Sequence, residues 1–343
     1  MAIALAENFK GLGIAAGVDI KAQVPIPYGA ALGVHVTVTN NETLAGKNDI
    51  VNLEVVNGKT WIASYNSGYR FIGPTMAGIG IPASNSTVTV GARFRAQVPG
   101  AAVANCPLFR IGGVQLTWNM PAQTQEFYAE MVLNRETGGL ELWVDNKRVG
   151  TFGPLTGGGL TGVRASTDNL VIAVGSTAYL MHTDVVVIHD MQDDGVNSRV
   201  GAVDISAVPL QVSSNPGYDV TAMADVLARK DYAPDTGTRV KGTNGVTQAE
   251  LKLVKANGYT LPNDTPVIGM CLVAKSIYTP GQPGDLRVTH KRGPSTRTVD
   301  STQLSVMPAL PNIVMGASSR SAAEQLAATA LDGLEISLKV MDR

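Results

Sequence analysis

The chain has 343 residues, of which 44% are hydrophobic and 5% aromatic, and its 27 basic and 28 acidic residues give a formal net charge of −1. This near-zero net charge does not predict binding to nucleic acid or to an anionic membrane. Thirty-seven glycines and eighteen prolines predict many short strands joined by turns. Only 16% of residues are charged, below the usual quarter, which indicates a surface partly covered by neighbouring molecules.

The first thirty residues are apolar and contain Pro25 and Pro27, without regular alternation. We interpret them as an N-terminal contact arm, lying either on its own sandwich or, as we favour, on another chain. The start lacks the basic region of a signal peptide. No run of eighteen apolar residues is present, so no membrane span is expected.

Strands are predicted in quick succession after this arm. Residues 31–39 and 86–98 alternate between apolar and polar side chains. Residues 49–56 and 59–65 flank Asn57-Gly58, the strongest short hairpin signal in the chain. Residues 108–119 are predicted as one further strand.

The run from Glu126 to Phe152 predicts a strand, a turn and a tight hairpin. In the second strand Leu140, Leu142 and Val144 point one way, and Glu141 and Trp143 point the other. The following Asp145-Asn146 pair tolerates the positive φ that a hairpin turn requires. We expect the apolar face to share one core with Val185 and Val187 of a later strand.

Strands are also predicted at 169–174 and 179–189, and the pattern becomes less regular near residue 195. Beyond it we predict strands at 203–212, 267–277 and 334–340, and short helices at 221–230 and after Ser321. At 250–254 a strand is favoured, although Thr247 and Glu250 would also form a helix capping box. The expected domains are an arm (1–30), a sandwich (31–195) and a second β-rich domain (196–343).

Two blocks resemble the concanavalin A-like or laminin-G-like sandwiches of bacteriophage tail, baseplate and fibre proteins. The first is Glu130 to Val149, where ELWVDN stands in place of a phrase like ELWVDG. The second is Asp184 to Val203, DVVVIHDMQDDGVNSRVGAV, a strand that ends in an acidic turn. The usual hairpin glycine is Asn146 here, which also tolerates a left-handed backbone. The resemblance implies a mainly β chain: a concanavalin A-like/jelly-roll sandwich, a second β-rich domain and few short helices.

Sandwiches of this class include glycoside hydrolases, in which paired carboxylates are the catalytic groups. Glu141 and Asp145 share a strand face, as do Glu126 and Glu130. Four residues along a strand span roughly 13 Å, which exceeds the ~5–9.5 Å between the carboxylates of a glycosidase. We therefore interpret these groups as solvent-facing charges and expect no catalytic residue and no enzyme activity.

The loop after residue 189 gathers oxygen ligands that calcium would accept, but without the regular spacing of a calcium loop. The residues of this weak calcium candidate are Asp190, Asp193, Asp194 and Asn197. A turn with Asx side chains capping backbone amides explains the same residues and is favoured. The four histidines, His35, His182, His189 and His290, are too scattered to predict a zinc site. No cofactor is expected.

Two tryptophans are candidates for contact with a partner. Trp143 lies on the polar face of its strand, and Trp61 follows Asn57-Gly58. Such side chains stack on sugar rings or pack against a partner domain or subunit, and packing is favoured. Cys106 and Cys271 are expected to be buried free thiols rather than a disulfide.

The favoured function is a structural virion component of a tailed bacteriophage, in the tail, baseplate or fibre region. It would act through interfaces with other virion proteins and with copies of itself, in particles assembled in the bacterial cytoplasm. The alternatives are a carbohydrate-binding module for host surface glycans and a capsid-surface decoration protein. An enzyme on the same fold is the least favoured hypothesis, and neither nucleic acid nor membrane is an expected partner.

Overall fold

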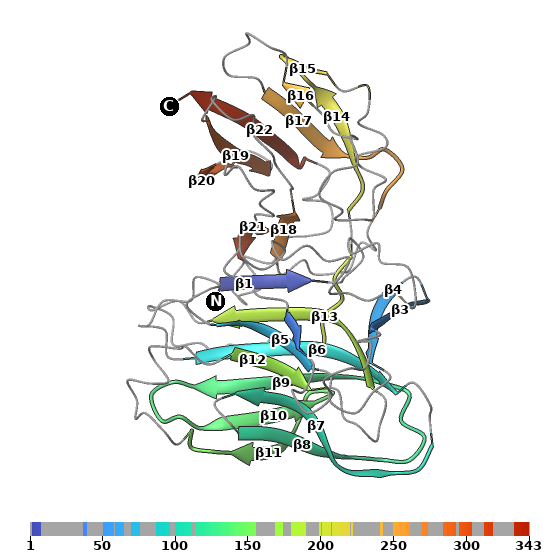
Figure 1. The fold of residues 1–343 in the computed structure, drawn as a ribbon. Helices are drawn as coiled ribbons and strands as arrows, with labels where there is room; N and C mark the ends of the chain where they lie inside the picture. Colours follow the sequence, from blue (N-terminus) through green and yellow to red (C-terminus); the bar gives the residue numbers. More distant parts are fainter. Residues whose placement is uncertain are drawn as a thin grey trace. The chain divides into compact units, whose positions relative to one another are not determined.

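The protein is seen here in a computed structural model, and in the residues it describes every regular element is a β-strand. The predicted mainly β class is therefore confirmed (Figure 1). The described residues are 2–7, 37–39, 51–57, 59–64, 70–75, 87–96, 100–111, 114–155, 169–173, 180–189, 199, 201–206, 208–219, 221, 241–242, 250–260, 269–273, 284–292, 295–303, 312–317 and 333–342. Within these stretches no helix is long and apolar enough to cross a membrane. The chain divides into two compact units, Met1–Ile205 and Ser206–Arg343.

The larger sheet of the first unit has eight antiparallel strands in the order β11-β10-β9-β6-β13-β4-β3, and β1 also pairs with β13. Its strands are β1 (Ala2–Glu7), β3 (Val51–Val56), β4 (Lys59–Ser64), β6 (Thr87–Ala96), β9 (Glu126–Asn134), β10 (Leu140–Val144), β11 (Lys147–Phe152) and β13 (Leu180–His189). Both predicted hairpins are confirmed, because β3 pairs with β4 and β10 pairs with β11. Their turns contain the left-handed residues Asn57, Asp145 and Asn146, at φ 52°, 44° and 66°.

A second, five-stranded sheet lies in front of the first in Figure 1 and completes a β-sandwich. Its order is β2 (Thr37–Thr39), β5 (Arg70–Thr75), β12 (Asn169–Ala173), β7 (Val103–Ile111) and β8 (Val114–Met120). Aromatic side chains join the two sheets: the ring centroids of Phe94 and Phe109 are 5.6 Å apart, edge to face, and those of Phe127 and Trp118 are 4.8 Å apart. Such pairs add stability beyond their buried area.

The second unit contains a five-stranded sheet and two short ladders. The sheet order is β14 (Leu210–Ser214), β17 (Glu250–Lys255), β22 (Glu335–Asp342), β19 (Gly284–Arg292) and β20 (Ser295–Gln303). The ladders pair β15 (Tyr218–Asp219) with β16 (Lys241–Gly242), and β18 (Gly269–Val273) with β21 (Asn312–Ala317). The strand interpretation of 250–254 is confirmed, with Leu251 and Leu253 buried on one face.

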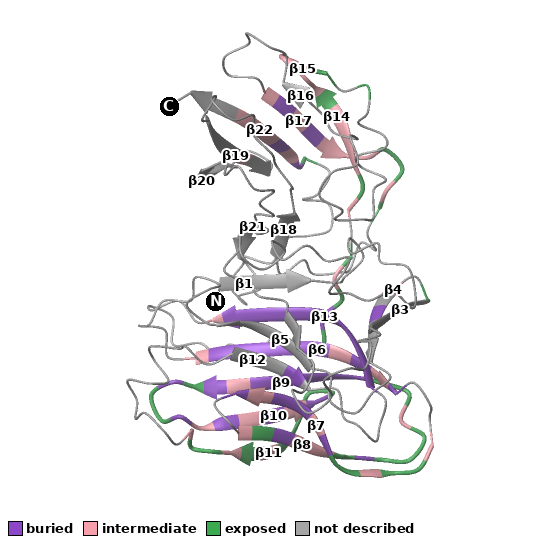
Figure 2. Ribbon diagram, in the orientation of Figure 1, coloured by how far each residue is buried: buried purple, intermediate pink, exposed green. Residues whose placement is uncertain are grey.

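The predicted register of the central hairpin is confirmed. Leu140, Leu142 and Val144 are buried, whereas Glu141 and Trp143 are half-buried on the opposite face (Figure 2). The expected burial of Val185 and Val187 is also confirmed. Sequence alternation did not reveal that the residues between and after them, Val186 and Ile188, would be buried as well. Both faces of β13 are therefore covered.

Two strand predictions need correction. Residues 108–119 are not one strand, because β7 ends at Ile111 and β8 begins at Val114, on either side of a Gly-Gly pair that favours a turn. Residues 203–206, 208 and 209 are not in a strand, and β14 begins only after Pro209, which has no backbone N–H to give to a ladder. The predicted helices lie outside the described residues, except for Thr221, which is in a turn.

In the described part of the predicted arm, β1 pairs with the chain's own β13. The register runs from Ala2 opposite His189 to Glu7 opposite Val185, with an irregularity between Ile3 and Leu5. Residues 8–30 of the predicted arm lie outside the described residues. Contact of the arm with a second chain stays a prediction.

Gly91 of β6 is required where β6 passes under Tyr128. A Cβ atom at position 91 would overlap the Tyr128 hydroxyl oxygen and lie 2.8 Å from ring carbon Cζ. Because Tyr128 is buried, we expect Gly91→Ala to lower the free energy of unfolding by about 1–3 kcal/mol, as overpacking does. Urea unfolding measures this loss. Tyr128→Phe removes the overlapping oxygen. The double variant Gly91→Ala, Tyr128→Phe should therefore lose less free energy of unfolding than the sum of the two single losses. A loss equal to that sum would contradict the clash.

Cys106 is a buried free thiol, which confirms the prediction for this residue, and the side chain of Cys271 lies outside the described residues. Burial raises the pKa of the Cys106 thiol to about 11. At pH 8 only about 0.1% would be the reactive thiolate. We expect titration in guanidinium to count two thiols, and mass spectrometry after native alkylation to find Cys106 unmodified. Rapid native alkylation of Cys106 would contradict its burial.

Candidate functional site

The most organised polar region of the described residues is where the chain leaves the sandwich. We name residues 199 and 201–204 the strap; it lies against the outer face of the larger sheet, the face that carries Glu130 and Arg93. Gly201 and Val203 of the strap are buried. The strap therefore covers a sheet face that would otherwise expose charged groups and β13 side chains to water.

One end of the strap is held by Glu130 of β9. The Arg199 Nε donates to Glu130 Oε2 over 3.1 Å, and the backbone N–H of Gly201 donates to Oε1 over 2.9 Å. Glu130 is 2% exposed, and both of its oxygens are thus satisfied. A buried carboxylate needs such partners, because water no longer solvates its charge.

The same arginine also contacts the β10–β11 hairpin. Its guanidinium carbon lies 3.6 Å from the centre of the Trp143 ring, a close cation–π contact. Its Nη2 donates to Asn146 Oδ1 in the hairpin turn over 3.2 Å. At the edge of the indole, Trp143 Nε1 donates to Glu141 Oε2 over 2.9 Å, and Glu141 pairs with Arg148 over 3.1 Å. The hairpin and the strap therefore form one polar cluster.

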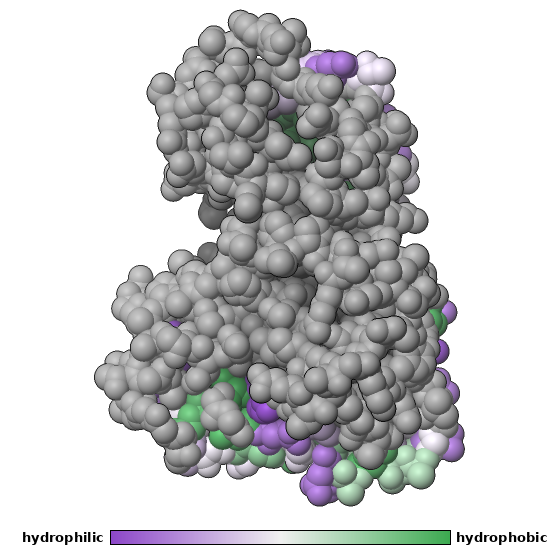
Figure 3. Space-filling model, viewed as in Figure 1, coloured by the Kyte–Doolittle hydropathy of each residue, from purple (hydrophilic) through white to green (hydrophobic). Residues whose placement is uncertain are grey.

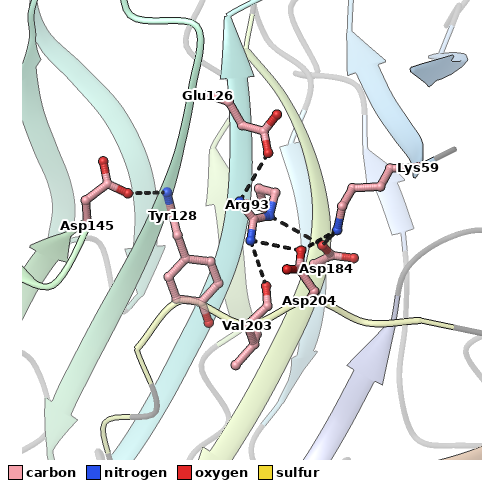
Figure 4. A network of polar contacts seen from close by, with 8 residues as sticks. All are labelled: Lys59, Arg93, Glu126, Tyr128, Asp145, Asp184, Val203 and Asp204. Carbon is pink, nitrogen blue, oxygen red and sulfur yellow. Dashed lines mark hydrogen bonds and ion pairs between the residues drawn. The ribbon is translucent and has the colours of Figure 1, made fainter. Parts of the chain in front are cut away.

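The other end of the strap is held by two cations from different strands (Figure 4). Arg93 of β6 donates to the carbonyl oxygen of Val203 over 3.2 Å and pairs with the Asp204 carboxylate over 2.9 Å. Lys59 of β4 pairs with the same Asp204 oxygen over 2.6 Å. Glu126 of β9 completes the group by pairing with Arg93 Nη1 over 3.1 Å.

Below these cations lies Asp184, at the bulge in β13 and with a left-handed backbone of φ 49°. It forms a close ion pair with Lys59, and its Oδ2 lies 3.5 Å from Arg93 Nε. Burial raises the pKa of Asp184, and the hydrogen bond from Lys59 and the charge of Arg93 oppose this only in part. Lys59 and Arg93 thus serve both a buried acid and the strap.

Asp204 differs from Asp184 because its side chain is largely exposed. Its partial burial raises the pKa, but the hydrogen bond from Lys59 and the charge of Arg93 outweigh that effect and lower the pKa overall. Asp204 therefore stabilises the folded state above its ordinary pKa, and this contribution is lost as pH falls through the lowered folded pKa. At neutral pH it is an ionised anchor for the strap.

The hairpin turn is tied to the same sheet face. The Asp145 carboxylate accepts a hydrogen bond from the backbone N–H of Tyr128 over 2.9 Å, and the Asp145 N–H donates to the Tyr128 carbonyl over 2.9 Å (Figure 4). Burial, followed by the charge of Glu130, raises the pKa of the Tyr128 hydroxyl well above its usual value. Tyr128 is thus a neutral packing residue beneath the cluster.

The structure corrects two interpretations of residues considered for the site. Trp61 is 1% exposed and packs with Met181, so it is not an exposed aromatic for a glycan or partner. Glu130 is not a solvent-facing charge, because the strap covers it. Alternation assigns Glu130 to one face of its strand but does not tell which face a distant segment will cover. For Trp61, the position just after a turn gave no information on packing with Met181 of β13.

Trp143 remains half-buried, with Arg199 stacked on one face of its ring. The four oxygen ligands of the calcium candidate, Asp190, Asp193, Asp194 and Asn197, lie outside the described residues. In the part of the chain that the structure describes, no three His, Cys, Asp or Glu side chains are grouped to hold a metal ion. On the surface seen in Figure 3, described hydrophilic and hydrophobic residues lie side by side at the lower end of the sandwich.

His182 is fully buried on β13, and burial lowers its pKa to about 3. His189 on the same strand is partly exposed, and the side chains of His35 and His290 lie outside the described residues. His182 packs beside Phe94, with 6.5 Å between the centres of the two rings.

Sequence reasoning did not single out Lys59, Arg93, Arg199 or Asp204 as members of the site. A usable signal was Asp184, a lone acid at the start of the apolar run VVVI, because a charge in a buried strand requires a partner. Nothing in the pattern indicated which cation would supply that partner. Lys59 and Asp184 are 125 positions apart in the chain, and Arg93 and Val203 are 110 positions apart.

No family model and no curated protein matches this chain. Among solved structures, the N-terminal tandem CBM22-1-CBM22-2 domain of Xyn10C from Paenibacillus barcinonensis aligns over 100% of this chain and 90% of its own, at 7% identity and a TM-score of 0.28. The binding domain of botulinum neurotoxin DC, solved with rat synaptotagmin II, aligns over 90% of this chain and 98% of its own, at 8% identity and a TM-score of 0.27. These likenesses are too low to carry a functional argument.

Proposed function

We propose that the chain is a non-catalytic structural component of a tailed-bacteriophage virion, in the tail, baseplate or fibre region. The observation that supports this is the meeting of the two sequence blocks that carry the resemblance. Glu130 and Trp143 from the first block contact Arg199 from the second, and Gly201 of the second donates to Glu130. The resembling phrases thus belong to one structural device rather than to two unrelated turns.

The chemistry of this cluster favours a mechanical role. The carboxylates of Glu126, Glu130, Glu141, Asp184 and Asp204 are each engaged by an arginine or lysine. A general acid or base needs a carboxyl group that is free to exchange a proton with a substrate. Two of these groups instead hold the strap: Glu130 binds Arg199 and Gly201, and Asp204 of the strap binds Lys59 and Arg93.

The test is whether purified phage particles contain the chain and whether the chain assembles. We expect mass spectrometry of gradient-purified virions to find it at the copy number of a symmetric component, and the full-length recombinant chain to form a closed oligomer in light scattering. A chain absent from particles and monomeric at all concentrations would overturn the proposal.

The carbohydrate-binding alternative places a sugar on Trp143. The stacked Arg199 counts against it, because the guanidinium already occupies one face of the ring. A glycan array separates the two functions. Selective binding of the full-length chain that is lost in Trp143→Ala would favour the alternative.

A further inference from the structure

The two halves of strand β13 pair with different strands on one of its sides. On one side it pairs with β6 from Leu180 to His189, with a bulge in between. On the other side β4 reaches only Met181 and His182, and β1 pairs with the stretch from Val185 to His189. We name this last stretch, Val185–His189, the acceptor edge.

The acceptor edge lies in apolar surroundings. Val185, Val186, Val187 and Ile188 are all buried, at 0–3% exposure. Backbone N–H and C=O groups in such a place need hydrogen-bond partners, because leaving them without partners costs about as much as a lost hydrogen bond. Among the described strands, β1 alone pairs with this side of the edge.

The strand that fills the edge is bound through a single ladder. Among the described strands β1 pairs only with β13, and the next described strand along the chain begins at Thr37. Residues 8–36 between them could span up to about 100 Å when extended. Contacts of β1 with the acceptor edge are therefore the same whether the strand belongs to this chain or to an adjacent one.

We propose that the acceptor edge is a binding site for an extended apolar peptide, and that its ligand in assemblies is the Ala2–Glu7 strand of a second copy. Exchange of an identical element between protomers needs no new contact, so it costs little. Covalent linkage between two binding partners replaces bulk concentration by an effective concentration, which reaches the order of millimolar for linkers that can span the sites. Copies held together at similar local concentration compete on equal terms. This inference rests on the proposed function in one respect: assembly into a particle brings the copies close together.

The first test asks whether the edge binds a strand added separately. A chain lacking residues 2–7 is mixed with a solubilised peptide containing AIALAE. We expect saturable binding in fluorescence anisotropy and a melting temperature about 5 °C higher when the peptide is at 100 times its Kd. The control peptide carries Leu5→Pro and Ala6→Pro, because adjacent strand residues donate in opposite directions and one of the two must face β13. Absence of binding, or equal binding of the control peptide, would overturn the site.

The second test asks whether a second copy supplies the strand. Ala6 lies opposite Val186, so Ala6→Cys and Val186→Cys in one chain should form an internal disulfide. The two single variants are refolded together at about millimolar concentration, the range in which the copies compete. We expect a mixed disulfide dimer on non-reducing gels. The control mixes the single variants Ala2→Cys and Val186→Cys, because Ala2 lies opposite His189 and not Val186. This control retains the native Cys106 and Cys271, so it also reports any dimer that they form.

An internal disulfide without a mixed dimer, or as much dimer in the control, would overturn exchange between copies. The outcome is separable from that of the proposed function. If particles contain the chain but no mixed disulfide dimer forms, only the exchange of β1 between copies is contradicted. Trapped dimers of a chain that is absent from particles would contradict only the virion role.

Discussion

Replacement of Arg199 by methionine is expected to lower the free energy of unfolding of the first unit by about 3–5 kcal/mol, the usual cost of breaking a buried ion pair from one side. Arg199 is 13% exposed and holds Glu130, which is 2% exposed. Without the guanidinium, the buried carboxylate of Glu130 loses its paired cation while the Gly201 N–H still donates to it, and Trp143 loses its stacked cation. Urea unfolding followed by tryptophan fluorescence measures the loss.

The matched control is Arg148→Met on the adjacent hairpin. Arg148 is 56% exposed and pairs with Glu141, which is 36% exposed, so solvent screens the pair. We expect a change within about 0.5 kcal/mol. Glu130→Gln together with Arg199→Met should recover part of the loss, because no charge is then left buried. If Arg199→Met costs no more than Arg148→Met, the strap is not held at this end as described.

The central hairpin could be predicted from the sequence because its determinants are local. Leu140, Leu142 and Val144 alternate with polar residues, and Asp145-Asn146 suits a turn with two left-handed residues. Side chains alternate between the two faces of a strand, so the register decides which residues face the core. The structure bears out both the turn and the buried face.

The covering of the outer sheet face could not be predicted in this way. Glu130, at a polar position of its strand, is buried because Arg199 and Gly201, 69 and 71 residues later in the chain, lie on it. Trp61 is buried although it follows an exposed turn residue, Asn57. Such burial depends on where distant segments cross the sheet, and a single strand pattern carries no information about that.

The prediction with the other large effect concerns acid stability and His182. Burial lowers its pKa to about 3 in the folded chain, whereas an exposed histidine in the unfolded chain titrates near 6.5. The unfolded state therefore binds more protons between these values, and stability falls as pH falls from 6.5 towards 3. We expect this group to lower the free energy of unfolding by about 2 kcal/mol at pH 5 and by on the order of 4 kcal/mol near pH 3.

Urea unfolding at pH 7, 6 and 5 isolates this effect, because most carboxylates titrate below that window. Asp184 acts in the opposite direction: its raised pKa favours protonation in the folded chain, so Asp184→Asn should steepen the loss. In His182→Leu the loss between pH 7 and 5 should shrink by about 2 kcal/mol, whatever the variant's stability at pH 7. A His182→Leu slope equal to the wild-type slope would show that another group sets the acid sensitivity of the sandwich.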